Sequence, residues 1–254
     1  RTLIISILIL NAITLAAIKP NRVYSYTPDK LDLNYEEFKV KTDDGFTLNV
    51  WHLPSEGDGT PVIISHSDAG NMGDWLYLGL YLQAYGLDVW MYDYRGFGQS
   101  DDFAIVQNQL FHMEFVKDLD AVSKYVYQKT GMSPALLGIS MGTIIVNEYL
   151  RVADSPVSKV VFDGYVSDPK AWNSRLTANG KTVTLPDGYK NRRYRQKNHD
   201  ALFIVSEKDA YSTLSDIPMA GKGKQVIKTF DCEHISGFFR YPEEYTDSVA
   251  EFLK

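Results

Sequence analysis

The sequence has few cysteines and few basic residues. Cys232 is the single cysteine among 254 residues, which excludes an internal disulfide framework and a metal site built from several cysteines. The 26 lysine and arginine residues stand against 32 acidic residues, so the formal net charge is −6. This balance argues against nucleic acid as the main partner, because nucleic-acid-binding proteins present a basic surface. Hydrophobic residues (44%) and charged residues (23%) occur at globular proportions, which excludes bulk disorder.

The sequence has one long uncharged hydrophobic run, at residues 3–18. As a helix it would reach about 24 Å at about 1.5 Å per residue, which is shorter than the ~30 Å core of a bilayer. It suits the apolar part of a secretory signal, with cleavage expected near Ala16 or Ala17. An uncleaved membrane anchor is the close alternative, and a buried helix of the fold is the third. We therefore expect residues 1–19 to direct export (periplasmic or secreted) or to anchor the chain in a membrane, and residues 20–34 to form a linker.

Strands and helices alternate from about residue 35. Residues 37–41 and 46–51 alternate polar and apolar side chains around the turn Asp43-Asp44-Gly45, as in a hairpin. Continuous apolar runs, which are typical of strands buried on both faces, follow at residues 61–65, 87–92, 135–137, 159–162, 201–205 and 225–230. Helical patterns lie at residues 75–84, 113–127, 143–152 and 247–253. The pattern predicts an α/β fold with a mostly parallel eight-stranded sheet flanked by helices.

The interval from Asp163 to Asp200 departs from this alternation. It has no clear apolar period and is too long for a plain connection. Residues 190–197 contain five basic side chains. They indicate either the solvated face of a short helix or a small cap, at about residues 165–199, that meets an anionic substrate or a lipid headgroup.

A nucleophile motif follows the apolar strand that begins at residue 135. Gly138-Ile139-Ser140-Met141-Gly142 has the spacing G-x-S-x-G and precedes a helix. A sharp turn from strand to helix would expose the Ser140 hydroxyl at a helix N-terminus, where the dipole favours negative charge. The two glycines would leave room where a Cβ atom would collide with neighbouring backbone. The motif in this context predicts that Ser140 is a nucleophile.

With this motif, residues ~35–254 resemble the α/β-hydrolase superfamily. Within it they resemble the serine hydrolases grouped with the S33 aminopeptidases and the Bem46-like, membrane-linked branch. The segment Ser65–Asn71 resembles the family loop that supplies one backbone N–H of the oxyanion hole, which maps to Asp68. Met141 would supply the other N–H. The sequence departs from the family at Ser67, where glycine is expected and where serine would strain the backbone.

Two further features of the resemblance indicate structural residues rather than catalytic ones. His66 resembles the family's structural histidine and is not counted as catalytic. The segment Asp93–Ser100 resembles the D-x-R-G-x-G-x-S loop of the family. We expect Asp93 and Arg95 to fix this loop by hydrogen bonds.

The end of the chain supplies the remaining catalytic candidates. Asp209 follows the seventh predicted strand and His234 follows the eighth, which matches the hydrolase order Ser…Asp…His. His234 would take the proton of Ser140, and Asp209 would orient the imidazole. Glu207 and Asp163 are alternatives for the acid. The remaining residues of interest are expected to pack or to lie at the surface: Cys232 as a small buried hydrophobe, and His52, His112 and His199.

These residues predict a serine hydrolase that cleaves a carboxylic ester, or a thioester or amide, through an acyl-enzyme. The expected substrate is a small-molecule or lipid-like acyl compound, as for an esterase or lipase, and neither a metal nor an organic cofactor is implied. Two alternatives are a non-catalytic binding protein with the same fold and a small-peptide aminopeptidase.

Overall fold

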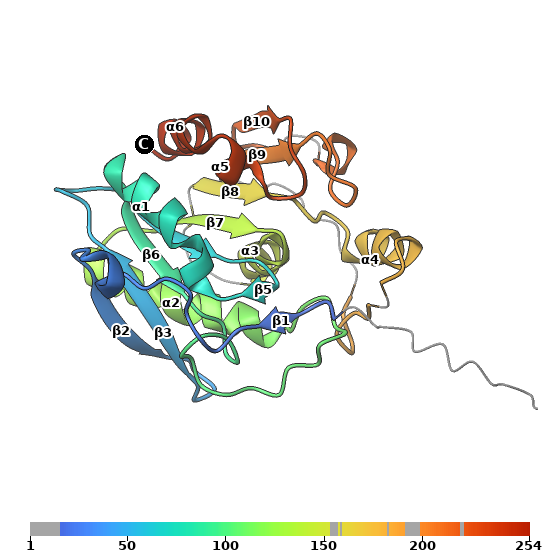
Figure 1. Cartoon of the computed structure of the whole chain (residues 1–254), viewed down its shortest axis with the longest axis horizontal. Coiled ribbons are helices and arrows are strands. Elements are labelled where there is room, and N and C mark those ends of the chain that lie inside the picture. Colours follow the sequence, from blue (N-terminus) through green and yellow to red (C-terminus); the bar gives the residue numbers. More distant parts are fainter. Residues whose placement is uncertain (1–15, 153–156, 158, 182, 191–198, 219–220) are drawn as a thin grey trace, which may run out of the picture.

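Eight strands form one twisted sheet in the computed structural model, which describes residues 16–152, 157, 159–181, 183–190, 199–218 and 221–254 (Figure 1). The strand order is β10-β9-β8-β7-β4-β6-β3-β2. Pairs β2–β3 and β3–β6 are antiparallel, and the other pairs are parallel. The predicted fold class is confirmed. The strands are β2 (Glu36–Lys41), β3 (Thr47–Leu53), β4 (Pro61–Ser65), β6 (Asp88–Tyr92), β7 (Ala135–Ile139), β8 (Lys159–Asp163), β9 (Asp200–Ser206) and β10 (Gln225–Phe230).

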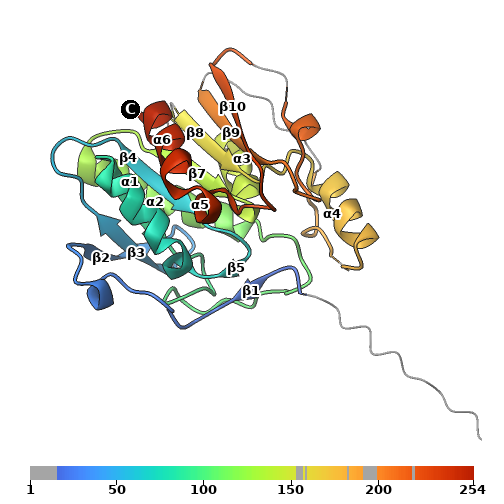
Figure 2. The ribbon, with the colours of Figure 1, turned by 45° about the horizontal axis from the view of Figure 1, so that its top comes forward.

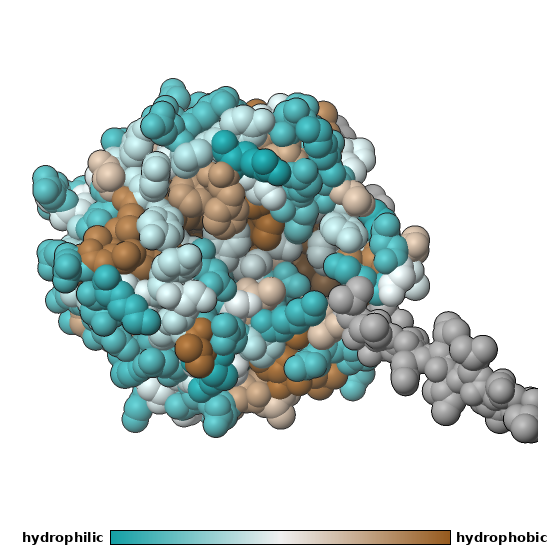
Figure 3. Space-filling view, viewed as in Figure 1, coloured by the Kyte–Doolittle hydropathy of each residue, from teal (hydrophilic) through white to brown (hydrophobic). Residues whose placement is uncertain are grey.

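Helices cover both faces of the sheet. Figure 2 shows α1 (Leu76–Ala84), α5 (Gly237–Arg240) and α6 (Pro242–Leu253) in front of it, and α2 (Glu114–Thr130) and α3 (Met141–Val152) behind it. Each layer buries its own apolar cluster against the sheet, because the strands between the layers are apolar on both faces. The surface in Figure 3 is mostly hydrophilic, and its hydrophobic residues occur in separate patches.

Two helices begin earlier than predicted. Helix α3 begins at Met141 rather than at residue 143, directly after the nucleophile motif. Helix α6 begins at Pro242 rather than at residue 247. Proline suits the first helical position because its φ angle is already helical and its missing N–H has no partner there.

The interval between β8 and β9 contains a helix that the sequence analysis did not find. Helix α4 (Pro169–Ala178) begins after Asp168, whose carboxylate accepts hydrogen bonds from two backbone N–H groups. It buries Trp172 and Leu176, four residues apart. Figures 1 and 2 both show α4 beyond the carboxyl ends of the parallel strands. Most of the predicted basic cluster, at residues 191–197, lies outside the described residues.

The N-terminal part of the described chain lies along the domain. The two-residue strand β1 (Lys19–Pro20) pairs in parallel with β5 (Ala69–Gly70), and Ile18 is fully buried. Residues 20–34, predicted as a linker, include the short helix η1 (Asp29–Leu31) and several contacts with the domain described below. Residues 1–15 lie outside the described residues. Among the residues that the structure does describe, no helix is long and apolar enough to cross a membrane.

Candidate active site

Ser140 lies at the turn between β7 and α3 with a left-handed backbone, φ 51°. This conformation is uncommon for a residue with a Cβ atom and is typical of strained functional turns. A Cβ atom on Gly138 would come within 2.8 Å of the Gly142 carbonyl oxygen, and one on Gly142 within 2.0 Å of the Ser65 carbonyl oxygen. Both glycines are therefore required by close backbone packing, as the motif predicts.

Ser140, His234 and Asp209 form one chain of hydrogen bonds. Ser140 Oγ lies 2.8 Å from His234 Nε2, and His234 Nδ1 lies 2.5 Å from Asp209 Oδ2. The other carboxylate oxygen of Asp209 accepts the backbone N–H of Tyr211 at 2.7 Å. The His234 side chain is 19% exposed, whereas that of Asp209 is fully buried. The structure thus brings together the three side chains predicted from sequence, with the histidine between the hydroxyl and the acid.

The two alternative acids occupy other environments. Glu207 is exposed. Asp163 is fully buried at the end of β8 and accepts a hydrogen bond from the Tyr245 hydroxyl at 2.9 Å. Burial raises the pKa of Asp163 to about 6. Of the three acids, Asp209 is the one hydrogen-bonded to His234.

The turn that carries His234 is also strained. Ile235, the next residue, has a φ angle of 50°, an outlier for a β-branched side chain. Gly164 lies against this turn, because a Cβ atom there would come within 2.6 Å of His234 Cε1 and 2.7 Å of Ile235 Cγ2. Backbone strain therefore occurs on both sides of the Ser140–His234 hydrogen bond, as expected where packing fixes reactive groups.

Two aromatic rings that the sequence analysis missed lie beside His234. The centroid of the Trp172 ring, from α4, is 6.1 Å from that of His234, and the centroid of the Tyr211 ring is 5.9 Å away. A bidentate ion pair, with distances of 2.7 and 2.6 Å, ties Arg175 of α4 to Asp216. The Asp168-Pro169 pair and the four-residue spacing of Trp172 and Leu176 are the signals that could have located α4.

The two candidate oxyanion residues lie on different elements, and their role remains a prediction. Met141 is the first residue of α3, and Asp68 follows β4 in the loop toward β5. Burial raises the pKa of the Asp68 carboxyl, against the opposing effects of its own backbone N–H and of the positive charges of His234 and Lys181. The expected strain at Ser67 is absent: the non-glycine residues with positive φ in the described chain are Asp32, Ser140 and Ile235. Serine therefore replaces glycine there in an ordinary backbone conformation.

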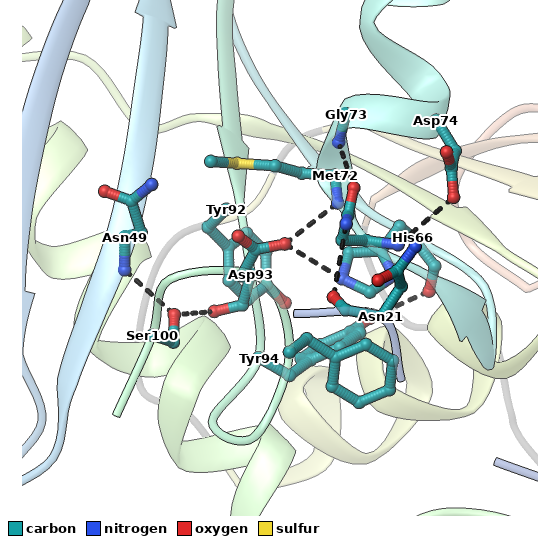
Figure 4. Close-up of polar contacts among 12 residues, drawn as sticks. Asn21, Asn49, His66, Met72, Gly73, Asp74, Tyr92, Asp93, Tyr94 and Ser100 are labelled. Carbon is teal, nitrogen blue, oxygen red and sulfur yellow. Dashed lines mark hydrogen bonds and ion pairs between the residues drawn. The ribbon is translucent and has the colours of Figure 1, made fainter. Parts of the chain in front are cut away.

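The loop after β6 is fixed by buried polar contacts, as predicted. Figure 4 shows the Asp93 carboxylate accepting the backbone N–H of Met72 at 2.9 Å, and the Ser100 hydroxyl donating to the Asp93 carbonyl at 2.7 Å. Arg95 is fully buried and donates to the carboxylates of Asp118 and Asp44 at 2.8 to 2.9 Å. These contacts fix the loop and leave neither side chain free for chemistry.

Cys232 and the other histidines have structural surroundings. Cys232 is buried, its thiol lies 3.4 Å from the Ser206 hydroxyl, and burial raises the pKa of the thiol, which keeps it unreactive. Three further histidines are buried away from Ser140: His52 contacts Glu36 and Asp88, His112 packs on aromatic rings, and His199 precedes β9. In the described part of the chain, no group of three or more His, Cys, Asp or Glu side chains is arranged to hold a metal ion.

Comparison with known proteins agrees with this architecture. The sequence profile of a family described as "alpha/beta hydrolase fold" matches residues 60–202, which is more than half of the chain. The chain belongs to this family. The solved structure of the Pyrococcus furiosus esterase Pf2001 is similar in fold, with a TM-score of 0.71, 19% identity, and coverage of 93% of this chain and 97% of that one. An esterase from Exiguobacterium antarcticum has a TM-score of 0.60 at 17% identity, and the match covers 86% of this chain and 99% of that one.

Similarity to curated proteins is modest. The uncharacterized protein YfhR of Salmonella typhi is 28% identical over 262 residues, which cover 92% of this chain and 85% of the relative. The uncharacterized membrane protein YNL320W of Saccharomyces cerevisiae is 33% identical over 76 residues, 30% of this chain and 27% of that protein. Mouse lipase member M is 31% identical over 129 residues, which cover 42% of this chain and 31% of that protein. The chain thus spans less than a third of the length of the yeast and mouse proteins.

Proposed function

We propose that the protein is a serine hydrolase that cleaves carboxylic esters through an acyl-enzyme. The observation that carries this proposal is the hydrogen-bonded chain from Ser140 through His234 to Asp209. In this order His234 Nε2 accepts the Ser140 proton as the hydroxyl attacks the carbonyl carbon. Asp209 holds Nδ1–H of the imidazole and stabilises the imidazolium that forms.

The remaining steps follow from the same groups. The carbonyl oxygen becomes an oxyanion, and the backbone N–H groups of Met141 and Asp68 are the proposed donors to it. The imidazolium of His234 then protonates the leaving alcohol as the tetrahedral intermediate collapses to the acyl-enzyme. Water, deprotonated by His234, attacks the acyl-enzyme, and collapse releases the acid and returns the proton to Ser140.

A serine-directed fluorophosphonate tests the nucleophile directly. We expect the probe to label the folded wild-type protein at Ser140 and to leave Ser140→Ala unlabelled. Ester turnover should fall by at least about 10⁴-fold in Ser140→Ala, because removing the nucleophile of such a group removes most of its catalysis. The melting temperature should change by less than about 4 °C, since one hydrogen bond is lost. Absence of labelling in the folded wild-type protein would favour a binding protein that uses this fold without chemistry.

A substrate panel distinguishes the acyl classes. We expect short-chain or long-chain esters to be cleaved faster than acyl thioesters of matched acyl group. The same panel includes aminoacyl amides, because the S33 aminopeptidase-like and Bem46-like relationships remain predictions. Faster cleavage of an aminoacyl amide than of every ester would replace the esterase proposal with a peptidase.

The export or anchoring of the chain also remains a proposal, supported by the uncharged run at residues 3–18. Fractionation of cells that express the full-length gene tests it. Recovery of the protein in the cytosol would contradict it.

A further inference from the structure

The segment Ala17–Tyr24, here called the N-terminal strap, runs along the loop that carries Asp68. The Lys19 backbone N–H donates to the Asp68 carbonyl oxygen at 2.9 Å, and the Asn21 N–H donates to the Gly70 carbonyl at 2.8 Å. These bonds belong to the parallel pairing of β1 with β5. The strap is therefore bonded directly to the residue that is the proposed oxyanion donor.

The strap is itself fixed to the body of the domain at both ends. At its start, the N–H groups of Ala17 and Ile18 donate to the Gln107 carbonyl at 2.7 and 3.0 Å, and Ile18 is fully buried. At its end, the Tyr24 hydroxyl donates to the Asp93 carboxylate. Because both of its ends are fixed, the strap has little freedom to move with the loop that carries Asp68. It can therefore hold that loop in place.

Contacts in the middle of the strap add to this support. The guanidinium of Arg22 donates to the Ser100 carbonyl at 2.7 Å and to the Phe97 carbonyl at 3.2 Å. The Asn21 carbonyl accepts the Gly98 N–H at 2.9 Å and the Asn71 side-chain amide at 3.2 Å. The strap thus joins the loop after β4 to the loop after β6.

The two proposed oxyanion donors differ in how they are held. Met141 is part of α3, and its position follows from the turn at Ser140. Asp68 lies in a loop, so its N–H needs other support to stay aimed at a developing negative charge. The β4 end of this loop is in close backbone contact with Gly142, where a Cβ atom would come within 2.0 Å of the Ser65 carbonyl oxygen. The β5 end is paired with the strap.

We infer that the N-terminal strap is a positioning element for the oxyanion hole, acting through the hydrogen bond from Lys19 N–H to the Asp68 carbonyl. This inference rests on the proposed function. Loss of the bond leaves the substrate-binding groups in place but loosens one oxyanion donor, so it weakens binding of the transition state more than binding of the substrate. Any modification of the chain that disturbs Ala17–Lys19 would therefore change the rate of the chemical step.

A proline substitution tests the bond itself. Lys19→Pro removes the N–H, and the matched variant Lys19→Ala removes the same side chain but keeps the N–H. We expect kcat for a short ester to be about tenfold lower in Lys19→Pro than in Lys19→Ala, with KM changed by less than about twofold, because a loosened donor costs less than the 10²-fold or greater loss of a deleted one. Affinity for a trifluoromethyl ketone that forms a tetrahedral adduct with Ser140 should fall by the same factor as kcat/KM.

Equal kcat in folded Lys19→Pro and Lys19→Ala would overturn the inference. The inference would also be wrong if Lys19→Pro lost as much affinity for the substrate as for the ketone. If Lys19→Pro does not fold, Arg22→Gln is the second variant. Arg22 is partly exposed, and its replacement disturbs two hydrogen bonds and an ion pair with Asp102 that hold the strap. We expect about a threefold loss of kcat in Arg22→Gln by the same reasoning. Arg240→Gln, which removes the exposed pair with Glu233, is the control for losing a surface arginine. Equal kcat in Arg22→Gln and Arg240→Gln would also overturn the inference.

Failure of the proposed function has a different signature. In that case the wild-type protein neither cleaves the esters nor reacts with the fluorophosphonate. If the wild-type protein does both, and the strap variants match their controls, the proposed function holds and the positioning role of the strap is wrong.

Discussion

Two histidine–aspartate pairs lie at the carboxyl edge of the sheet, and they differ in burial and in contact. Asp209 and His234 follow the neighbouring strands β9 and β10, while His66 and Asp93 follow the neighbouring strands β4 and β6. In the first pair the nitrogen and oxygen are 2.5 Å apart and the imidazole is 19% exposed. In the second pair they are 4.0 Å apart, and the side chains are 1% and 0% exposed. The same two residue types therefore form one hydrogen-bonded pair whose imidazole is partly exposed to solvent and one pair that is fully buried.

The second ring nitrogen distinguishes the two histidines further. His234 Nε2 faces the Ser140 hydroxyl at 2.8 Å, whereas His66 Nδ1 lies 2.8 Å from the backbone carbonyl oxygen of Ser67. Burial lowers the pKa of His66 to about 4 and raises the pKa of Asp93 to about 6. The buried pair is thus biased against both charges, which suits a structural role. A hydroxyl partner and contact with solvent are what make the other pair suitable for proton transfer.

Replacing Asp209, the acid of the accessible pair, should have the largest effect, and the effect is on catalysis. Asp209→Asn is expected to lower kcat by about 10³- to 10⁴-fold, because the amide favours the wrong imidazole tautomer and cannot stabilise the imidazolium. Steady-state ester hydrolysis measures this loss. Glu207→Gln is the matched control, since Glu207 is an exposed carboxylate two residues away.

The comparison between the pairs fails if Asp209→Asn keeps more than a tenth of the wild-type kcat, or if Glu207→Gln loses as much. The first outcome would mean that another acid orients His234, and buried Asp163 would be the residue to replace next.

Replacing the buried histidine should change stability with a defined dependence on pH. The pKa of His66 is lowered from 6.5 to about 4, so its contribution to stability is complete above pH 6.5 and is lost as the pH falls through 4. Between pH 7.5 and pH 5 the wild-type protein should therefore lose about 2 kcal/mol more stability than His66→Asn, which does not titrate. Urea unfolding at the two pH values measures the difference. The same loss in both proteins would show that His66 is not buried as a neutral ring.

The parts of the site that were predictable from sequence have local causes. Gly138, Ser140 and Gly142 could be assigned because strand, turn and helix each leave a pattern in consecutive residues. The strand before Asp209 is a continuous apolar run, and the strand before His234 mixes apolar and polar residues. The positions just after both strands could still be assigned to one edge of a parallel sheet. The sequence favours Asp209 as the acid but does not exclude Glu207 or Asp163, because burial and the direction of a side chain depend on the turn after each strand.

The parts that were not predictable depend on contacts between distant residues. The pairing of β1 with β5 involves two residues on each side, too few for any hydrophobic period. Tyr24 contacts Asp93 from 69 residues away, and nothing near either residue signals the contact. Helix α4 has a weak apolar face, and only Asp168-Pro169 marks its start. The N-terminal strap and helix α4 are therefore the regions where the structure adds most to the sequence.

The smallest expected effect concerns the acid of the buried pair and has the opposite sign to that of His66. The pKa of Asp93 is raised from 3.8 to about 6, so its contribution to stability is complete below pH 3.8 and is lost as the pH rises through 6. When the pH falls from 7.5 to 5, the wild-type protein should gain about 1 kcal/mol of stability relative to Asp93→Asn. Over the same range it should lose about 2 kcal/mol of stability relative to His66→Asn. Urea unfolding of both variants at both pH values separates the two. If the wild-type protein instead loses stability relative to Asp93→Asn over this range, the pKa of Asp93 is lowered in the folded protein, and the contrast between the buried and the accessible pair is wrong.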